Sequence, residues 1–361
     1  MDFSTREALE FPQLLTILQG YGESRYAQER IKNLQPLSSV EEITRELQRV
    51  EEMRYLQRRS GGFPGGGLRD LEPLIFRAKA QGSRLDADEL WGIVLNLRVH
   101  SQVRKLLDLE RPHLPHISHL ARNLTPLPAL EEAIARAIHP DGTVKDNASS
   151  QLQRIRKEIG ALQETIRERL NGIIVKWSRI GALREPTFTI REGRYVLPIR
   201  SDAMGKVKGI IHDRSSTGGT LFLEPAALID LGNDLRSWEL AERDEIERIL
   251  KELTGKVREN LPQLEENYQI MGELDLLWAK AQLAERWGGV SPLIKEGLPL
   301  RLVGCRHPLL FLSGDRPVVP LDLELGTKYT TLVISGPNAG GKTVAIKTVG
   351  LLCLMALCGI P

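Results

Sequence analysis

Residues 151–176 read QLQRIRKEIGALQETIRERLNGIIVK. Apolar side chains recur here at alternating spacings of three and four, with charged residues between them: Leu152, Ile155, Ile159, Leu162, Ile166, Leu170 and Ile173. This periodicity predicts one long amphipathic helix with a coiled-coil-like seam. At a rise of about 1.5 Å per residue, the helix would reach roughly 40 Å.

A second helical pattern begins near Leu231 and is limited by Pro262, because proline disrupts a helix interior. Its apolar positions are Leu235, Trp238, Ile246, Ile249, Leu253 and Val257. The two helices have similar lengths, so we expect them to pair antiparallel. The sequence therefore predicts a helical stalk, with the intervening residues at its tip.

The intervening segment, residues 184–223, changes to a two-residue period that is typical of strands. The predicted strands are residues 187–191, 195–199, 208–212 and 220–223. Turn pairs separate them: Glu192-Gly193, Met204-Gly205 and Gly218-Gly219. We expect a small β-rich module at the end of the stalk.

Positive charge is concentrated in this module. Residues 176–214 contain nine basic and four acidic side chains, a net charge of +5, so the rest of the +2 chain carries −3. A protruding basic surface suits phosphate backbones, with salt-sensitive affinity. The alternative is a solvated surface whose basic residues keep the strands soluble, and charge alone does not decide between them. The candidate nucleic-acid or ribosome contacts are Arg191, Arg194, Arg200, Lys206, Lys208 and Arg214.

The first 150 residues indicate a helical core domain. A first helix is predicted from a cap at Ser4 or Thr5 to its end at Gly20 and Gly22, with Leu9, Leu14, Leu15 and Leu18 at helical spacing. Further helices are predicted over residues 40–59 and 87–109. The glycine-rich residues 60–67 indicate a loop. Residues 111–128 hold four prolines and are expected to be irregular. Three histidines lie there, His113, His116 and His119, and a solvated loop is favoured over a metal site because no cysteine or carboxylate set accompanies them.

Composition excludes several classes of protein. With 41% hydrophobic and 27% charged residues, the chain has the composition of a soluble globular protein. Three cysteines exclude a disulfide scaffold and fit a reducing compartment. Neither a secretory signal nor a membrane-spanning run is visible. A cytoplasmic location is expected.

The strongest motif lies at residues 336–343, GPNAGGKT, which match the phosphate loop G-x-x-x-x-G-K-[ST]. The apolar, β-branched residues 330–334, TTLVI, predict a buried parallel strand before it, and residues 344–357 predict a helix after it. Glycines allow the backbone to approach phosphate oxygens. Lys342 would contact the β- and γ-phosphates of ATP, and the Thr343 hydroxyl would bind Mg²⁺.

Hydrolysis requires a further carboxylate that holds Mg²⁺ through water. Residues 344–361 contain no Asp or Glu. The sequence therefore predicts a loop that holds a nucleotide without a complete hydrolytic site. Cys353 and Cys358 are five residues apart, off a shared helical face, and are expected in the core.

Three segments resemble the MutS family. The loop itself is similar, with its Pro337-Asn338 pair, and residues 306–310, RHPLL, resemble the opening strand motif of the family's ATPase domain. Residues 193–199, GRYVLPI, and 209–225, GIIHDRSSTGGTLFLEP, resemble the clamp of the bacterial MutS type-2 subfamily, which lacks mismatch-recognition domains. The resemblance covers essentially the whole chain.

The resemblance implies a mainly α fold with a small β-rich clamp, followed by the start of an α/β P-loop (ABC-type) ATPase domain. The implied domains are a helical core (1–150), an ascending lever helix (151–183), the clamp (184–230), returning lever helices (231–290) and the start of the ATPase domain (291–361). The implied ATP ligands are Gly336, Pro337, Asn338, Ala339, Gly340, Gly341, Lys342 and Thr343, with Thr343 on Mg²⁺ and Val318 against the adenine.

The resemblance also implies a homodimer that encloses DNA, branched or duplex, or a stalled ribosome with its rRNA. Such proteins are linked to suppression of homologous recombination and to splitting of collided ribosomes, and they carry a C-terminal Smr domain that is a nuclease in some members. The alternatives are a non-catalytic fragment that binds nucleic acid or ribosomes and, less well supported, a P-loop kinase or GTPase with a helical extension.

Overall fold

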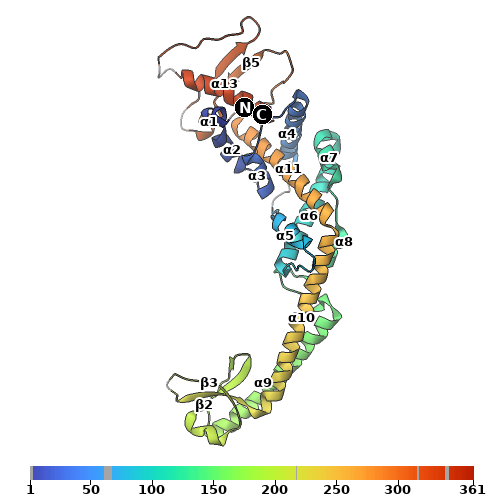
Figure 1. Ribbon diagram of the computed structural model, residues 1–361, viewed down its shortest axis with the longest axis vertical. Coiled ribbons are helices and arrows are strands. Elements are labelled where there is room, and N and C mark those ends of the chain that lie inside the picture. The colour runs from blue at the N-terminus through green and yellow to red at the C-terminus, as the bar shows by residue number, and fades with distance from the viewer. Residues whose placement is uncertain (1–2, 61–66, 217, 315–316, 338–340) are drawn as a thin grey trace. The chain divides into compact units, whose positions relative to one another are not determined.

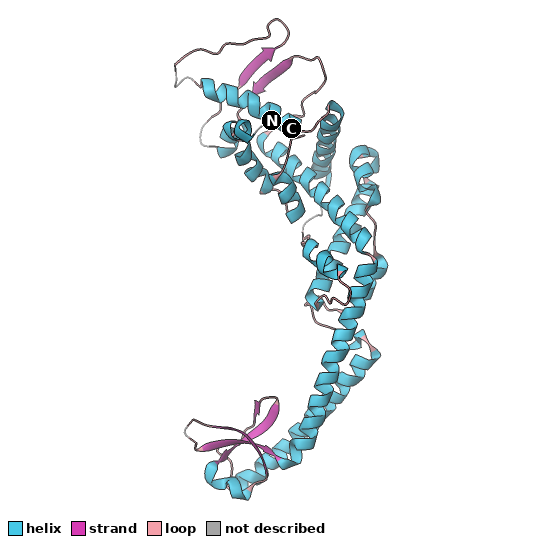
Figure 2. Ribbon diagram, viewed as in Figure 1, coloured by secondary structure: helices cyan, strands magenta, loops and turns pink. Residues whose placement is uncertain are grey.

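The computed structural model describes residues 3–60, 67–216, 218–314, 317–337 and 341–361, and it is mainly helical with small antiparallel sheets (Figures 1 and 2). The chain divides into two compact units. Unit 1 comprises Met1–Lys79, Gly92–Glu131 and Val257–Pro361, and unit 2 comprises Ala80–Trp91 and Glu132–Lys256. None of the described helices is long and apolar enough to cross a membrane.

Two long helices form the stalk of unit 2, as predicted: α9 (Ser150–Arg179) and α10 (Ile229–Glu259). The hydroxyl of Ser149 caps α9 by accepting from the Leu152 amide. Arg156 Nε donates to Glu242 at 2.7 Å, and Ser149 Oγ donates to Glu245 at 2.6 Å. These contacts join the start of α9 to the middle of α10, while Leu170 and Trp177 of the later part of α9 pack with Leu235 near the start of α10, so the helices are antiparallel (Figure 1).

The four strands at the stalk end are also confirmed. They are β1 (Thr189–Arg191), β2 (Arg194–Arg200), β3 (Gly209–Arg214) and β4 (Thr220–Pro225), antiparallel in the order β1-β2-β4-β3, and the short helix η4 (Ser201–Lys206) joins β2 to β3. Glu192 and Gly193 have φ values of 50° and 75°, which fits the predicted tight hairpin turn between β1 and β2. We call β1 to β4 with η4 the β-module.

One face of the β-module packs on the stalk. Leu197, Ile199, Leu221 and Leu223 share a single apolar core with side chains of both stalk helices, Ile166, Leu170, Trp177 and Leu235. Because sheet and helices bury the same core, the β-module is fixed to the stalk end rather than held by its connections alone.

The other elements belong to the helical parts of the two units. In chain order they are α1 (Phe3–Ala8), α2 (Phe11–Gln19), α3 (Arg25–Lys32), α4 (Val40–Ser60), α5 (Glu72–Lys79), α6 (Ala87–Leu109), η1 (Arg111–His113), α7 (Pro115–Leu120), η2 (Ala121–Asn123), α8 (Pro128–Ala137), η3 (Asp146–Ala148), η5 (Ala226–Leu228), α11 (Leu261–Trp287), β5 (Leu300–Cys305), α12 (Pro308–Ser313), β6 (Leu321–Leu325) and α13 (Lys342–Leu357). The helices predicted over residues 40–59, 87–109 and 344–357 are confirmed as α4, α6 and α13.

Three predictions in the helical parts need correction. The single helix expected from Ser4 or Thr5 to Gly20 is divided into α1 and α2 at Glu10, with φ of 60°, because Pro12 is accepted only in the first turn of a new helix. The segment 111–128 is partly helical, since Pro112 and Pro115 occupy first turns of η1 and α7. Residues 308–310 of the expected strand motif begin α12, with Pro308 in its first turn. The predicted loop 60–67 lies mostly outside the described residues.

Helix α11 forms the centre of unit 1. It has buried side chains all around its axis and contributes to two apolar clusters, one with α4, α6 and α7, the other with α2, α3 and α13. Pro262 lies in its first turn, so the predicted end of the preceding helix is confirmed.

Three buried polar side chains of α11 are each hydrogen-bonded to a distant segment. Asn267 exchanges two 2.8 Å hydrogen bonds with the backbone of Thr125. Asp275 accepts from the amide and hydroxyl of Ser24 at 2.6 Å. Lys280 is 1% exposed and donates to Glu46 at 2.6 Å and to the Cys358 carbonyl at 3.0 Å. Burial alone would raise the pKa of Glu46, but the Lys280 ammonium outweighs it and lowers that pKa.

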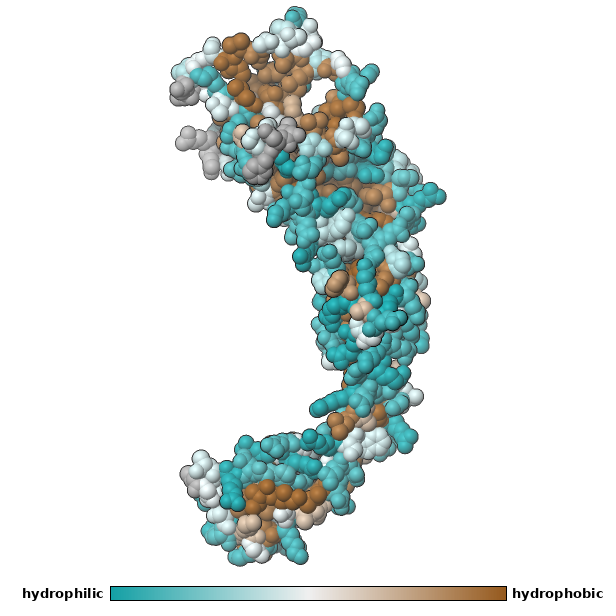
Figure 3. All heavy atoms as spheres, viewed as in Figure 1, coloured by the Kyte–Doolittle hydropathy of each residue, from teal (hydrophilic) through white to brown (hydrophobic). Residues whose placement is uncertain are grey.

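The segment before the phosphate loop differs from its prediction. Residues 330–334 do not form a strand, and Val333 is 83% exposed. A strand requires a hydrogen-bonding partner, and β5 and β6 pair only with each other among the described residues. Hydrophobic atoms gather over this part of unit 1 in Figure 3. The described residues therefore do not form the parallel sheet of a P-loop domain.

Replacing Lys280 by Met should destabilise the protein by about 3 kcal/mol, because the largely buried Glu46 carboxylate would lose its 2.6 Å partner and keep only Arg49, 3.7 Å away. The double variant Lys280→Met/Glu46→Leu should recover most of this loss. Lys79→Met is the control: its ammonium also lies 2.6 Å from a carboxylate, that of Glu265, but the pair is exposed, so the loss should be below about 1 kcal/mol. Urea unfolding at pH 7 measures the free energy of unfolding of the two single variants and of the double variant. Equal losses for Lys280 and Lys79 would contradict the prediction.

His100 should make stability depend on pH. It is 2% exposed, and burial lowers its pKa to about 4, below its value of about 6.5 when unfolded. Its stabilising contribution is therefore complete above pH 6.5 and is lost as the pH falls towards 4, by up to about 3 kcal/mol. Urea unfolding between pH 7 and pH 4 should show this loss as a difference between the parent and His100→Leu. The prediction would be contradicted if the free energy of unfolding changed equally with pH in the parent and in His100→Leu.

Candidate phosphate loop and basic module

The described part of the phosphate loop has the backbone geometry that its glycines predict. Gly336 and Gly341 have φ values of 146° and 79°, a backbone conformation that residues other than glycine rarely adopt. Gly341 is the N-cap residue of α13, so the loop leads directly into a helix N-terminus. Asn338, Ala339 and Gly340 lie outside the described residues.

Lys342 and Thr343 occupy the first turn of α13. The Lys342 ammonium donates to the carbonyl of Gly336 at the opposite end of the loop, so one cation reaches across the whole loop. Thr343 is exposed. The backbone N–H groups of the first turn and the positive end of the helix dipole attract an anion at this point. These residues fit a polyphosphate chain, and a hydroxyl at this position is a suitable Mg²⁺ ligand.

Packing holds α13 firmly behind the loop. Leu351, Leu354 and Met355 are buried in the cluster that includes α2 and α11, and Lys347 forms a 2.9 Å ion pair with Glu10. The thiol of Cys358 is free and buried, and burial raises its pKa to about 11. A thiol with so high a pKa is unreactive at neutral pH, in agreement with its predicted core position.

Pro337 and Val318 are two further residues that the resemblance predicts to contact ATP. Pro337 is exposed beside Gly336. Val318 is partly buried in the segment that precedes β6. Its role against an adenine stays a prediction.

Arg194 of the β-module is engaged in a buried network. Its guanidinium lies 3.3 Å from Glu224, which is 2% exposed, and it donates to Asn233 of α10 at 2.7 Å. Glu224 also lies 2.8 Å from His212 Nε2. Gly232 packs closely against this network, because a Cβ would lie 3.0 Å from side-chain atoms of both Arg194 and Glu224. The network joins β2, β3 and β4 to the start of α10.

Two other predicted contacts also have partners. Arg191 lies over the Phe222 ring, 4.7 Å from its centroid, and 3.9 Å from Asp213. Arg200 forms two hydrogen bonds with Asp202, at 3.1 and 2.9 Å, and both side chains are exposed. Solvent and salt can replace an exposed pair, so Arg200 remains available to a ligand.

Lys206, Lys208 and Arg214 complete the predicted set. All three are exposed, and none has an ion pair with another described residue. Lys206 and Lys208 flank Val207 between η4 and β3, and Arg214 ends β3. The uncompensated positive charge of the β-module is therefore on β3 and the residues before it.

The histidines of residues 111–128 do not form a metal site. Among the described residues, no group of three His, Cys, Asp or Glu side chains could hold a metal ion. The His113 ring packs on Tyr55 with centroids 5.1 Å apart.

The sequence is similar to proteins named Endonuclease MutS2. It is 38% identical to that of a Geobacillus species over 98% of this chain and 45% of the relative, and 38% identical to that of Pelotomaculum thermopropionicum over 100% and 45%. The Clostridium perfringens protein is 36% identical over 98% and 44%.

The chain thus spans slightly less than half the length of these curated relatives. No protein-family model matches it. The relatives match it from end to end, across the stalk, the β-module and the phosphate loop. The chain belongs to the MutS type-2 family.

Proposed function

We propose that this chain supplies the nucleotide-binding loop and the nucleic-acid-binding module of an ATP-dependent clamp that acts on DNA or on ribosomes. The observation that carries the proposal is the position of Lys342, in the first turn of α13 and in contact with Gly336 across a glycine loop. Membership of the MutS type-2 family supports it.

ATP and Mg²⁺ are the proposed ligands of the loop. When bound, ATP supplies a polyphosphate with four negative charges and, with Mg²⁺, binding free energy that can favour one conformation over another. The N–H groups at the start of α13 and the Lys342 ammonium hold the phosphates, and Thr343 orients the metal. The core around α11 holds α13 in place and excludes water from its buried side.

The β-module is the proposed contact with a nucleic acid. Lys206, Lys208 and Arg214 carry positive charge without an ion pair among the described residues, which suits a phosphate backbone. Arg194 acts as a positioning residue for the module, because its guanidinium neutralises the buried Glu224. Arg191 and Arg200 are secondary contacts whose present partners are exposed.

The wider role belongs to the longer proteins of this family. We propose that such a protein works as a cytoplasmic homodimer in suppression of recombination or in rescue of collided ribosomes. The relatives are named endonucleases; nuclease activity of the complete protein, in an Smr domain, is part of the same proposal.

A second candidate is a fragment that binds nucleic acid and nucleotide without hydrolysis. It is favoured by the arrangement before the phosphate loop, where the described residues 330–334 form no strand and no parallel sheet. Binding and turnover of ATP, measured separately on this chain, distinguish the two candidates.

Lys342→Ala should weaken ATP binding by about tenfold or more, because the variant loses a charge-assisted contact to phosphate. Titration of Mg·ATP into the 361-residue chain, followed by calorimetry, measures the affinity. Lys295→Ala, an exposed lysine of the same unit outside the loop, is the control and should bind like the parent. Unchanged affinity in Lys342→Ala would refute the proposed nucleotide site.

The pair of changes Lys206→Gln and Lys208→Gln should weaken binding of a short DNA duplex. The slope of log affinity against log salt should fall by about one unit for each lysine that contacts a phosphate. Lys251→Gln with Lys256→Gln removes the same charge from α10, where both lysines are already paired with glutamates, and should change the slope little. Equal effects of the two double variants would mean that overall charge, and not the β-module, drives binding.

A further inference from the structure

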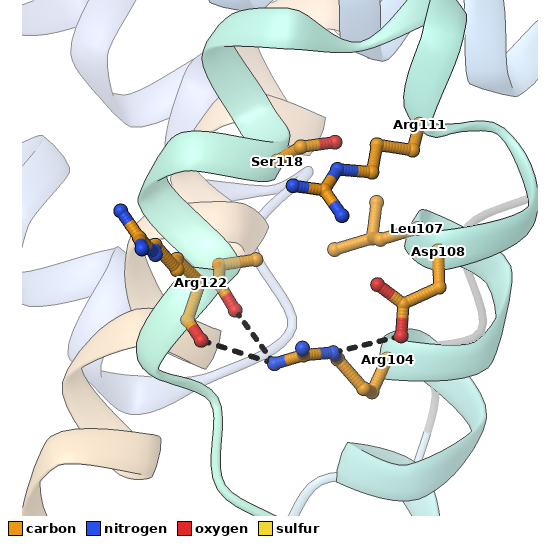
Figure 4. A pocket seen from close by; sticks show the side chains of 7 residues that line it. Arg104, Leu107, Asp108, Arg111, Ser118 and Arg122 are labelled. Carbon is orange, nitrogen blue, oxygen red and sulfur yellow. Dashed lines mark hydrogen bonds and ion pairs between the residues drawn. The ribbon is translucent and has the colours of Figure 1, made fainter.

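A second cluster of arginines lies in unit 1, around a pocket at the end of α6 (Figure 4). The pocket is small and open to solvent, and it is formed by α6, η1, α7 and η2. Its lining residues are Arg104, Leu107, Asp108, Arg111, Ser118, Ala121 and Arg122. Three guanidinium groups and one carboxylate leave a surplus of two positive charges.

Arg104 is held rigidly at the base of the pocket. Its Nε donates to Asp108 at 2.9 Å, and its Nη1 donates to the carbonyls of Arg122 and Leu124 at 3.1 and 3.0 Å. No hydrogen bond joins its Nη2 to another described residue, and Leu107 and Arg111 lie on the same side of the pocket in Figure 4. A fixed guanidinium with one free edge loses little entropy when it binds an anion.

Two more donors lie above Arg104. The hydroxyl of Ser118 is buried and has no hydrogen-bond partner. The guanidinium of Arg111 lies beside Ser118 in Figure 4, and no ion pair joins Arg111 to another described residue. A buried polar group without a partner is costly, and so is an accumulation of like charge. Both costs are relieved by one oxyanion that accepts from all three side chains.

Asp108 does not fill this role. Its carboxylate is occupied by Arg104 Nε, and its side chain is 56% exposed. It therefore orients Arg104 while leaving Arg111 and Ser118 without an acceptor. Arg122 adds positive charge near the pocket, but its guanidinium points away from Arg111 and Arg104 in Figure 4.

We propose that this pocket binds a single phosphate group, held by Arg104, Arg111 and Ser118. Arg111 brings a positive charge that no described carboxylate pairs, Arg104 is already fixed by Asp108, and arginine forks suit the tetrahedral oxygens of a phosphate anion. A phosphodiester of a nucleic acid offers the same oxygens with a single charge. The site uses none of the residues proposed to bind ATP.

The test is a calorimetric titration of inorganic phosphate into the 361-residue chain carrying Lys342→Ala, which disables the phosphate loop. Ionic strength is held constant with chloride. In this background, Arg111→Ala should weaken phosphate binding by about tenfold or more. Ser118→Ala should weaken it by a smaller factor, and Arg122→Ala should have little effect. Lys105→Ala, an exposed charge of the same helix that does not line the pocket, is the matched control.

Three outcomes overturn the proposal: no phosphate binding in the Lys342→Ala background, equal binding by Arg111→Ala, or an equal loss in Lys105→Ala. Unfolding curves without phosphate show whether each variant is folded. A parallel titration with a short DNA duplex identifies the source of the phosphate. Arg111-dependent binding of both ligands supports a nucleic-acid backbone, and Arg111-dependent binding of phosphate alone supports a small phosphate-bearing molecule.

Discussion

The burial of α11 from Ile270 to Ala284, nearly all around its axis, is the constraint on which unit 1 depends. Asp275 and Lys280 lie within this stretch and Asn267 is buried just before it, so all three side chains must find partners inside the protein. Each partner lies on a segment more than 100 residues away in sequence, and Lys280 also binds a carbonyl at the end of α13. The hydrogen bonds that satisfy α11 therefore also fix the helix that follows the phosphate loop.

The parts of the fold that could be predicted are those encoded by local periodicity. The three-four spacing from Leu152 to Ile173 predicts α9, and the Glu192-Gly193 pair predicts the hairpin turn. Non-local partners have no such signal. Residues 330–334 have the composition of a strand, but hydrogen bonding to a neighbour decides whether a strand forms. Nothing in the spacing around Ser24 or Glu46 indicates that both meet α11.

The candidate functional sites also differ in how far the local sequence predicts them. A phosphate loop is local, so eight consecutive residues suffice to place Lys342 and Thr343 at a helix start. A basic surface is not local, because the net charge of a segment includes side chains that neutralise one another after folding. Glu224 lies 30 residues beyond Arg194, and the sequence offers no reason to pair them. Charge counting therefore overestimates how many of the six bases are free to bind a ligand.

The exposed residues 330–334 also affect how this chain behaves in concentrated solution. Residues 329–337, YTTLVISGP, contain no charged side chain, and the first six favour strands. Their backbone groups have no ladder partner among the described residues, and Val333 and Leu332 face solvent. Such a segment is a template for pairing between chains, and no lysine or glutamate within it opposes that pairing. Self-association and loss of solubility at high protein concentration would begin at this segment.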